Sequence, residues 1–232
     1  YGYVYDGVYR YEDFNEVAPG VFQLKPEIPN NTNERANIKP GDPKLKDING
    51  DGKVTAEDQT VIGHGLPIHT GGFTNNFEWK GFDLSIFFQW SYGNDVINYN
   101  RARLESLDGR HLNQLATVKN HWTPRTTLAD NTVVEGNYTN YLWAVNRGLS
   151  NIHTSREVED ASFLRLKNVQ LGYRFPNKVL KRLHLSSLRM YISAQNLYTW
   201  TSYTGYDPEV STRNSAMTRG FDYSAYPKAK TF

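Results

Sequence analysis

The sequence predicts an all-β fold, namely an antiparallel segment of a transmembrane β-barrel with long extracellular loops and short periplasmic turns. Three observations support this prediction. Residues 82–92 alternate apolar and mostly polar side chains over a length that suits a membrane-crossing strand. The same alternation returns in residues 70–79, 162–175 and 188–198. Short connections between these runs alternate with long polar ones, as in outer-membrane barrels.

Residues 82–92 carry the clearest strand pattern. Successive side chains of a strand point to opposite faces, so Asp83, Ser85, Phe87, Gln89 and Ser91 would share one face, and the other would be wholly apolar. A tilted strand needs about 9–11 such residues to cross a bilayer, and a soluble sheet rarely needs so long an aromatic stripe. The apolar row consists of Phe82, Leu84, Ile86, Phe88, Trp90 and Tyr92.

The composition excludes several classes of function. Lys+Arg 26 against Asp+Glu 24 leaves a net charge of +2, which gives no argument for a nucleic-acid partner. The absence of cysteine excludes disulfides and thiolate metal sites. No apolar run reaches the roughly 18 residues that a membrane-spanning helix needs. The first residues show neither an initiator Met nor a signal peptide, so we expect a piece of a longer polypeptide.

The first 46 residues are expected to be mainly irregular. Tyr1, Tyr3 and Tyr5 alternate with other residues, which fits either the end of a strand or a tyrosine-rich loop rim. Residues 12–46 contain five prolines and an Asn-rich run, and both features favour turns because proline fixes φ and removes a donor. This stretch is predicted to be a long surface loop.

Residues 47–58 match the calcium loop of an EF-hand. Oxygen-bearing side chains stand at loop positions one, three and five, glycine stands at six for the sharp turn, and a carboxylate stands at twelve. Calcium needs six to eight hard oxygen ligands, and this spacing wraps the chain around a point. The predicted structural Ca²⁺ site comprises Asp47, Asn49, Asp51, the Lys53 carbonyl, Thr55 (directly or through water) and Asp58.

Two departures from the template shape this prediction. Position twelve is Asp58 and not the longer Glu, and Pro43 disfavours an incoming helix. The loop therefore resembles the dockerin type, in which a single exit helix follows the metal, here over residues 55–62. The alternative is a solvated turn without metal. In either case the role is structural, because three carboxylates with no adjacent His or nucleophile provide no acid–base pair.

The strands begin after this loop. In residues 70–79 Phe73, Phe77 and Trp79 share one face, with Asn75 as the exception, and Lys80-Gly81 predicts a tight hairpin turn to the next strand. Residues 93–159 form a long polar outer loop, in which leucines at helical spacing between residues 101 and 122 suggest one or two helices.

The last strands are predicted over residues 162–175 and 188–198. In the first of them the apolar phase slips by one residue near Lys167-Asn168, which predicts a β-bulge. Pro176 ends that strand, and a short basic connection follows. A second outer loop covers residues 201–227, and an extended run begins at Lys228.

Several stretches together resemble the C-terminal part of the SusC/RagA-like TonB-dependent (TonB-linked) outer-membrane transporters of Bacteroidota. They span most of the chain from Asp47 onward and follow the order of that family. The stretches are Gly50-Asp51-Gly52-Lys53, Val61-Ile62-Gly63, the run from Lys80 to Gln89, Tyr92-Gly93-Asn94-Asp95, the run from Glu159 to Asn168, Leu171-Gly172-Tyr173, Ser193-Ala194-Gln195-Asn196-Leu197, and Thr204-Gly205-Tyr206-Asp207-Pro208-Glu209.

The resemblance implies a barrel of about 22 strands with a plugged lumen, of which residues 1–232 supply about the last five or six strands. It implies import of an oligosaccharide or peptide under a SusD-like surface lipoprotein lid. Energy would come from the TonB complex through an N-terminal part that is absent here. It places the protein in the outer membrane, in contact with lipid, and pairing of two transporter–lid pairs is one assembly that it allows.

The main alternative is a secreted soluble carbohydrate-binding β-sandwich with a structural calcium. It accounts for the aromatic residues and the metal loop, but the apolar strand face would then need a second sheet. An enzyme is not expected, because the six histidines, His64, His69, His111, His121, His153 and His184, are scattered with no catalytic spacing. Rings such as Trp122, Tyr138, Tyr141, Trp143, Trp200 and Tyr203 either grip a substrate or, more simply, pack the loops.

Overall fold

The computed structural model describes residues 1–107, 113–149, 152–209, 212 and 219–232, and the chain forms two compact units. Unit 1 comprises Tyr1–Gly63 and Asn98–Val158, and unit 2 comprises His64–Ile97 and Glu159–Phe232. The helices among these residues are all too short or too polar to span a membrane. His111 and Leu112 lie outside the described residues, so the structure does not bear on them.

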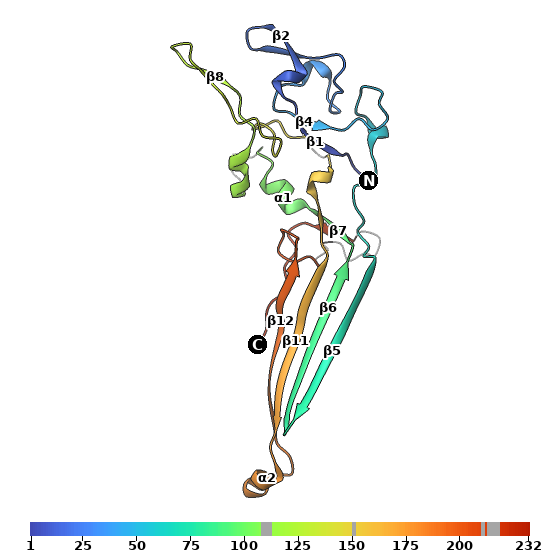
Figure 1. Ribbon diagram of the computed structural model, residues 1–232, viewed down its shortest axis with the longest axis vertical. Coiled ribbons are helices and arrows are strands. Elements are labelled where there is room, and N and C mark those ends of the chain that lie inside the picture. The colour runs from blue at the N-terminus through green and yellow to red at the C-terminus, as the bar shows by residue number, and fades with distance from the viewer. Residues whose placement is uncertain (108–112, 150–151, 210–211, 213–218) are drawn as a thin grey trace. The chain divides into compact units, whose positions relative to one another are not determined.

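Unit 2 is built on a four-stranded antiparallel sheet with the order β12-β11-β6-β5. Its strands are β5 (His69–Trp79), β6 (Phe82–Tyr92), β11 (Phe163–Arg174) and β12 (Arg189–Thr201). Figure 1 shows these long strands lying side by side as a twisted ribbon. The sequence predicted all four; the bounds of β6 agree, and the ends of the other three differ by at most three residues.

The two connections at one end of this sheet differ in length. Lys80 and Gly81 join β5 to β6 as a two-residue turn, with φ of 45° and 88°, which is the left-handed pair that a type I′ hairpin needs. The connection between β11 and β12 contains the helix α2 (Asn177–Leu183), which begins directly after Pro176. The sequence analysis predicted the first turn and missed this helix, because its basic residues give no clear apolar stripe.

The predicted bulge is present in the middle of the sheet. Leu166 pairs with Phe88 and Asn168 pairs with Phe87, so Lys167 is an extra residue relative to β6. On the other side Leu166 pairs with Tyr198 and Asn168 with Gln195, so β12 carries an extra residue of its own. Asn196 in that stretch has a φ of 53°, a left-handed conformation that Asn tolerates.

The remaining elements of unit 2 lie near the ends of the long strands. β10 (Val158–Asp160), β7 (Asp95–Asn98) and β13 (Phe221–Asp222) form a three-stranded sheet in that order. Val96, Ala161 and Tyr203 form a small buried cluster beside it. Near the C-terminus Thr231 exchanges backbone hydrogen bonds with Gln195, which places an extended segment at the outer edge of β12.

Unit 1 consists of short elements. The strands β1 (Tyr5–Val8) and β4 (Pro43–Leu45) pair, as do β2 (Phe14–Ala18) with β3 (Val21–Leu24) and β8 (Thr126–Thr127) with β9 (Val133–Val134). The one α-helix described in this unit is α1 (Tyr99–Leu104), whose N-cap Asn98 accepts a hydrogen bond from the Arg101 amide. The 3-10 helices are Tyr11–Asp13, Arg35–Asn37, Ala56–Asp58, Ala116–Asn120 and Ser155–Glu157.

Residues 12–46 are more ordered than expected. Tyr9, Phe14, Leu24 and Ile38 form a buried cluster, so the proline-rich stretch folds around a core of its own. A second cluster joins Val8 to Trp122, Leu142 and Trp143. The apolar residues of these cores are far apart in sequence and follow no single period, which is why the pattern predicted a loop.

Two predicted helices are not formed as expected. The exit helix over residues 55–62 is only a 3-10 turn, Ala56–Asp58, because Gln59 is already extended and Thr60 pairs with the backbone of Gly2. The leucine spacing between residues 101 and 122 yields α1 and the 3-10 helix Ala116–Asn120, with no described helix between them.

Candidate functional site

The two faces of the long sheet differ in character. The cross-strand register aligns the apolar rows of all four strands on one face, so that Phe73 lies opposite Phe88 with their rings stacked at 4.9 Å. Phe88 in turn lies opposite Leu166, which lies opposite Tyr198. Ile192 on this face is 72% exposed. A large exposed apolar face of this kind is what a barrel wall presents to lipid.

The opposite face carries polar side chains. Ser85 lies opposite Asn76 and Gln170, and Gln170 lies opposite Ser193, so the middle of this face is uncharged and hydrogen-bonding. In unit 2 this face resembles the lumen wall of a water-filled or plugged barrel. The face also holds two groups of charged residues, one around Arg165 and one formed by Asp83 and Arg189.

Arg165 is the centre of one charged group. Its side chain is 2% exposed, and its Nη2 donates to Oδ1 of Asp207 at 2.5 Å. Its Nη1 lies 3.2 Å from Oε2 of Glu209, an oxygen that Lys228 Nζ also approaches at 2.5 Å. The guanidinium also lies 5.1 Å from the centre of the Phe163 ring. The cluster thereby ties the segment after β12 to the polar face of β11.

Asp207 stays ionised in this cluster. Burial raises the pKa of its carboxyl, but hydrogen bonds from the Glu209 amide and the Arg165 guanidinium outweigh burial and bring the pKa below its usual value. Its second oxygen accepts from the Lys228 amide at 3.2 Å. Arg165 and Asp207 are 42 residues apart, so local sequence does not reveal their ion pair.

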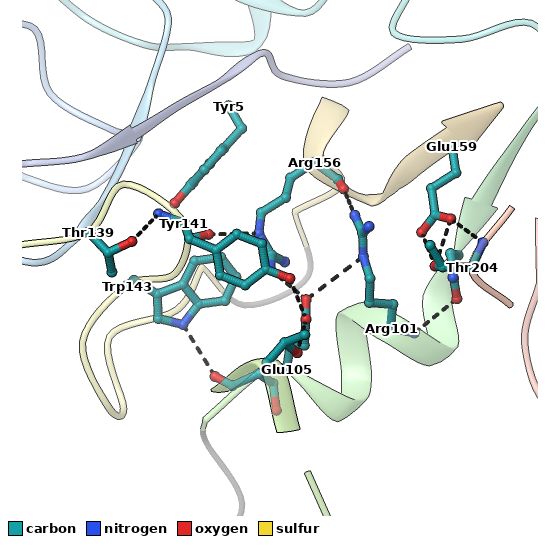
Figure 2. A network of polar contacts seen from close by, with 12 residues as sticks. Tyr5, Arg101, Glu105, Thr139, Tyr141, Trp143, Arg156, Glu159 and Thr204 are labelled. Carbon is teal, nitrogen blue, oxygen red and sulfur yellow. Dashed lines mark hydrogen bonds and ion pairs between the residues drawn. The ribbon is translucent and has the colours of Figure 1, made fainter. Parts of the chain in front are cut away.

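Glu105 is the centre of a polar network in unit 1 (Figure 2). Its side chain is fully buried, and it accepts hydrogen bonds from the hydroxyls of Thr117 and Tyr141 and, at 2.5 Å, from Arg156 Nη2. Arg101 Nε lies 3.8 Å from it, and Arg101 also donates to the carbonyl of Arg156. One carboxylate thus joins four segments that are separated in the sequence.

Charge and aromatic contacts keep this network ionised. Burial raises the pKa of Glu105, but the Thr117 hydroxyl and the charge of Arg156 outweigh burial and hold the pKa below its usual value. The Arg156 guanidinium lies 5.3 Å from the ring centres of both Tyr141 and Trp143. The network therefore fixes the fold of unit 1 and offers no proton donor near neutral pH.

The predicted calcium loop is closed by its own backbone. Asp47 accepts hydrogen bonds from the amides of Gly50 and Gly52, at 2.7 and 2.8 Å. Asn49 accepts from the Asp51 amide, and Asp51 accepts from the Lys53 amide. These bonds bend the chain into the tight loop that the EF-hand spacing predicts.

Asp58 joins the two ends of this loop. Its Oδ1 accepts from the amides of Ile48 and Asn49, and its Oδ2 accepts from the Thr55 amide at 2.8 Å. Burial raises the pKa of Asp58, but these amides more than compensate and lower it below its usual value. Within the described part of the chain, no three His, Cys, Asp or Glu side chains gather as a metal cluster.

Three of the six aromatic residues that the sequence singled out pack the interior, whereas Tyr141 and Trp200 are exposed. Trp122 and Trp143 in unit 1 are 4% and 9% exposed, and Tyr203 in unit 2 donates to Asp222 from a buried position. Trp200 is 48% exposed, in keeping with its place at the end of β12. The roles of Arg165 and Glu105 do not follow from the sequence pattern, because each depends on partners more than ten residues away.

Comparison with known proteins gives a consistent set of relatives. TonB-dependent receptor P3 of Formosa agariphila is 35% identical over 100% of the chain, and receptor P39 of the same organism is 31% identical over 98% of it. TonB-dependent receptor SusC of Bacteroides thetaiotaomicron is 28% identical over 84%. The chain spans about a fifth of the length of these curated relatives, 21%, 23% and 17% respectively. No protein-family model matches the chain.

Solved structures agree with the sequence relatives. The chain aligns over 99% of its length with the RagAB peptide transporter at a TM-score of 0.66 and 25% identity. It aligns equally far with the RagAB peptide importer in the closed-closed state, at a TM-score of 0.63 and 26% identity. In both cases it covers 21% of the solved chain.

These relatives are receptors and transporters, which confirms the expectation that the chain is not an enzyme and displaces the soluble β-sandwich as its fold. The exposed apolar face of the long sheet, its lumen-like polar face and the sequence relatives lead to one assignment. The chain belongs to the SusC/RagA-like family of TonB-dependent outer-membrane β-barrel transporters and corresponds to a C-terminal part of such a transporter.

Proposed function

We propose that the whole protein imports a nutrient, an oligosaccharide or a peptide, across the outer membrane in a TonB-dependent manner. The four-stranded sheet of unit 2 supplies part of the barrel wall, and unit 1 supplies extracellular structure. The observation that carries this proposal is the sheet with one exposed apolar face and one polar, ion-paired face. The curated relatives, all TonB-dependent receptors, support the energy source.

The two-faced sheet suits transport. An apolar row such as Phe73, Phe88 and Leu166 is stable against hydrocarbon, whereas the backbone amides of the two inner strands, β6 and β11, are satisfied by neighbouring strands. The polar row offers hydrogen bonds on the side where a solute or a plug would lie. A wall of this kind lets a solute pass without any covalent bond being made or broken, in agreement with the absence of catalytic spacing in the sequence.

The partners belong to the same proposal. A SusD-like lipoprotein would close the barrel from outside, and the TonB complex would act through a part of the protein that this chain does not include. The family motifs around Gly50, Gly172 and Asp207 support this assignment. Pairing of two transporter–lid pairs is the assembly that accompanies it.

Calcium is proposed as a structural ligand of residues 47–58. The loop has the oxygen donors and the glycine at position six that the ion requires, and its backbone is already bent around Asp47. Asp47, Asn49, Asp51, the Lys53 carbonyl, Thr55 and Asp58 would hold the ion. Its charge would offset those of the Asp47, Asp51 and Asp58 carboxylates.

Uptake by whole cells tests the import proposal. The parent strain, a deletion strain and the deletion strain carrying the full-length gene are fed mixed oligosaccharides and peptides, and depletion of the medium is followed by mass spectrometry. We expect a subset of solutes to disappear only when the protein is present, and a protonophore to stop their uptake. Equal depletion by the deletion strain, or uptake that resists the protonophore, would contradict the proposal.

A further inference from the structure

Unit 1 contains a cavity of about 670 Å³. This volume lies within the range of small-ligand sites, about 300–1,000 Å³. Its lining comes from two parts of the unit that are distant in sequence, residues 11–40 and residues 121–147. The cavity is therefore a product of the fold and not of a single loop.

Three aromatic side chains form the walls of the cavity. The Tyr11 ring centre lies 5.1 Å from that of Phe22 and 5.7 Å from that of Trp122. The Arg125 guanidinium lies 4.8 Å from the Tyr11 ring centre and pairs with Glu16 at 2.9 Å. These contacts hold the rings in fixed positions, so the cavity is preformed.

The exposed part of the lining includes two valines. Val21 and Val145 line the cavity and remain 52% and 49% exposed. Ala36, Pro40 and Ala144 add further apolar lining. Isolated exposed valines are ordinary, but two of them at the mouth of an aromatic-walled cavity favour a ligand with a bulky apolar group.

The charged groups in the lining are all basic. Lys39 and Arg147 line the cavity, together with His121, whereas no carboxylate and no side-chain amide does so. Arg147 is held by Asp42 through two hydrogen bonds, at 2.5 and 2.6 Å, so its position is fixed. Within the described residues, the buried indole Nε1 of Trp122 has no hydrogen-bond acceptor. The charge of Arg147 is balanced by Asp42, so the lining offers hydrogen-bond donors and the charge of Lys39 to a ligand that brings acceptors.

We propose that this cavity binds a peptide segment in which a carboxylate lies next to a bulky apolar side chain. A neutral oligosaccharide presents many hydroxyls, which are best matched by side chains that accept as well as donate, and this lining has no carboxylate or side-chain amide. The apolar walls suit a side chain, and Lys39 suits the carboxylate. The proposal rests on the import function above and selects peptides as the substrate class.

Calorimetry on the purified full-length transporter with its partners tests the proposal. The probes are the tripeptide Ala-Ala-Phe, its C-terminal amide and maltotriose. We expect Ala-Ala-Phe to bind, its amide to bind at least about fivefold more weakly because one charged hydrogen bond is lost, and maltotriose not to compete. Val145→Glu, which places a carboxylate at the mouth of the cavity, should weaken Ala-Ala-Phe at least about tenfold by repulsion. Lys39→Gln should weaken Ala-Ala-Phe to the level of the amide.

Matched controls separate the cavity from general charge effects. Val133→Glu changes an equally exposed valine of β9, and Lys119→Gln removes an exposed lysine that does not line the cavity; both should bind as the wild type does. Wild-type affinity in Val145→Glu, equal binding of acid and amide, no binding of Ala-Ala-Phe, or competition by maltotriose would each overturn the proposal. None of these results affects the import function, whose failure would appear as uptake independent of the protein.

Discussion

Asp83 and Arg189 form a two-point ion pair across β11, although their strands β6 and β12 are not neighbours. Arg189 Nη2 lies 2.5 Å from Asp83 Oδ2, and Nε lies 3.0 Å from Oδ1. The pair crosses directly over Gly172, which lies opposite Asp83 on one side and Tyr191 on the other. A Cβ at Gly172 would come within 2.6 Å of Asp83 Oδ2 and 2.7 Å of Arg189 Nη2. Gly172 is therefore needed for room and not for an unusual φ.

Gly172→Ala is expected to break this pair and reduce the yield of folded barrel. Both charged side chains would have to move away from the added methyl group, because its carbon would lie closer to their polar atoms than a normal contact distance. Folding is measured as the heat-modifiable gel band of the full-length protein. In an Arg189→Ala background, Gly172→Ala should reduce the folded yield less. An equal reduction there would show that the ion pair is not the reason for the glycine.

Phe88→Arg tests which face of the sheet meets lipid. Phe88 lies in the apolar row between Phe73 and Leu166, so an arginine there should cost about 2–4 kcal/mol of folding free energy near the middle of a bilayer. Ser85→Arg, on the opposite face of the same strand, is the control and should cost little. The free energies of unfolding are compared by urea titration in lipid vesicles, and equal costs would contradict the assigned facing.

Asp207→Ala removes the closest partner of a buried guanidinium. Arg165 is 2% exposed and Asp207 is 6% exposed at its side chain, so the change should destabilise the segment after β12 by about 3–5 kcal/mol. Limited proteolysis of the full-length protein should show faster cleavage after residue 201. Asp207→Asn, which keeps a hydrogen-bond acceptor without the charge, should show an intermediate rate. Cleavage of Asp207→Ala at the wild-type rate would show that the ion pair does not hold the segment after β12 against β11.

Glu105→Gln is expected to loosen unit 1. It removes the charge that Arg156 pairs with, and a hydrogen bond to a charged group contributes about 1.5–3 kcal/mol. The folded pKa of Glu105 is below its usual value of 4.5, so the carboxylate stabilises the fold fully above that pH and progressively less as pH falls toward the folded pKa. Amide hydrogen exchange of unit 1 between pH 6 and about pH 3, corrected for the intrinsic exchange rate at each pH, should rise in the wild type and change less in Glu105→Gln. Glu12→Gln, at a side chain that is 74% exposed, is the control and should follow the wild type.

The calcium loop is tested by replacing two of its predicted ligands. Asp47→Ala combined with Asp51→Ala should abolish calcium binding, measured as metal content after dialysis of the full-length protein. At a calcium concentration about 100-fold above Kd, bound metal stabilises the native loop by about 2.7 kcal/mol, and trypsin cleavage at Lys53 should slow accordingly. Glu57→Gln lies in the same loop outside the ligand set and should retain the metal. Unchanged metal content in the double variant would refute the site.

The long strands were predictable because their pattern is local. A period of two over eleven residues, as in β6, leaves little freedom, and the phase slip at Lys167 marked the bulge before any pairing was known. The turn at Lys80-Gly81 was equally local, since its conformation needs only the glycine and its neighbour. These features depend on residues that are adjacent in the chain.

The structure of unit 1 was not predictable in the same way. Glu105 meets Tyr141 and Arg156 across 36 and 51 residues, and Tyr9 packs with Ile38 across a stretch rich in proline. No period connects such residues, so the sequence suggested loops where there are small cores. The expected exit helix failed for a related reason, because the pairing of Thr60 with Gly2 outweighs the local tendency toward helix.

The extra residue at Lys167 sets the phase of β11. Above it Leu166 lies with Phe88 in the apolar row, and below it Val169 lies with Ile86 in that same row, although three positions separate the two. If Lys167 paired with Phe87 as a regular strand residue, every side chain from Asn168 to Arg174 would turn to the opposite face, with Gln170 toward hydrocarbon and Leu171 toward water. The bulge therefore keeps the second half of β11 facing the same way as the first half, although the sequence alternation shifts between them.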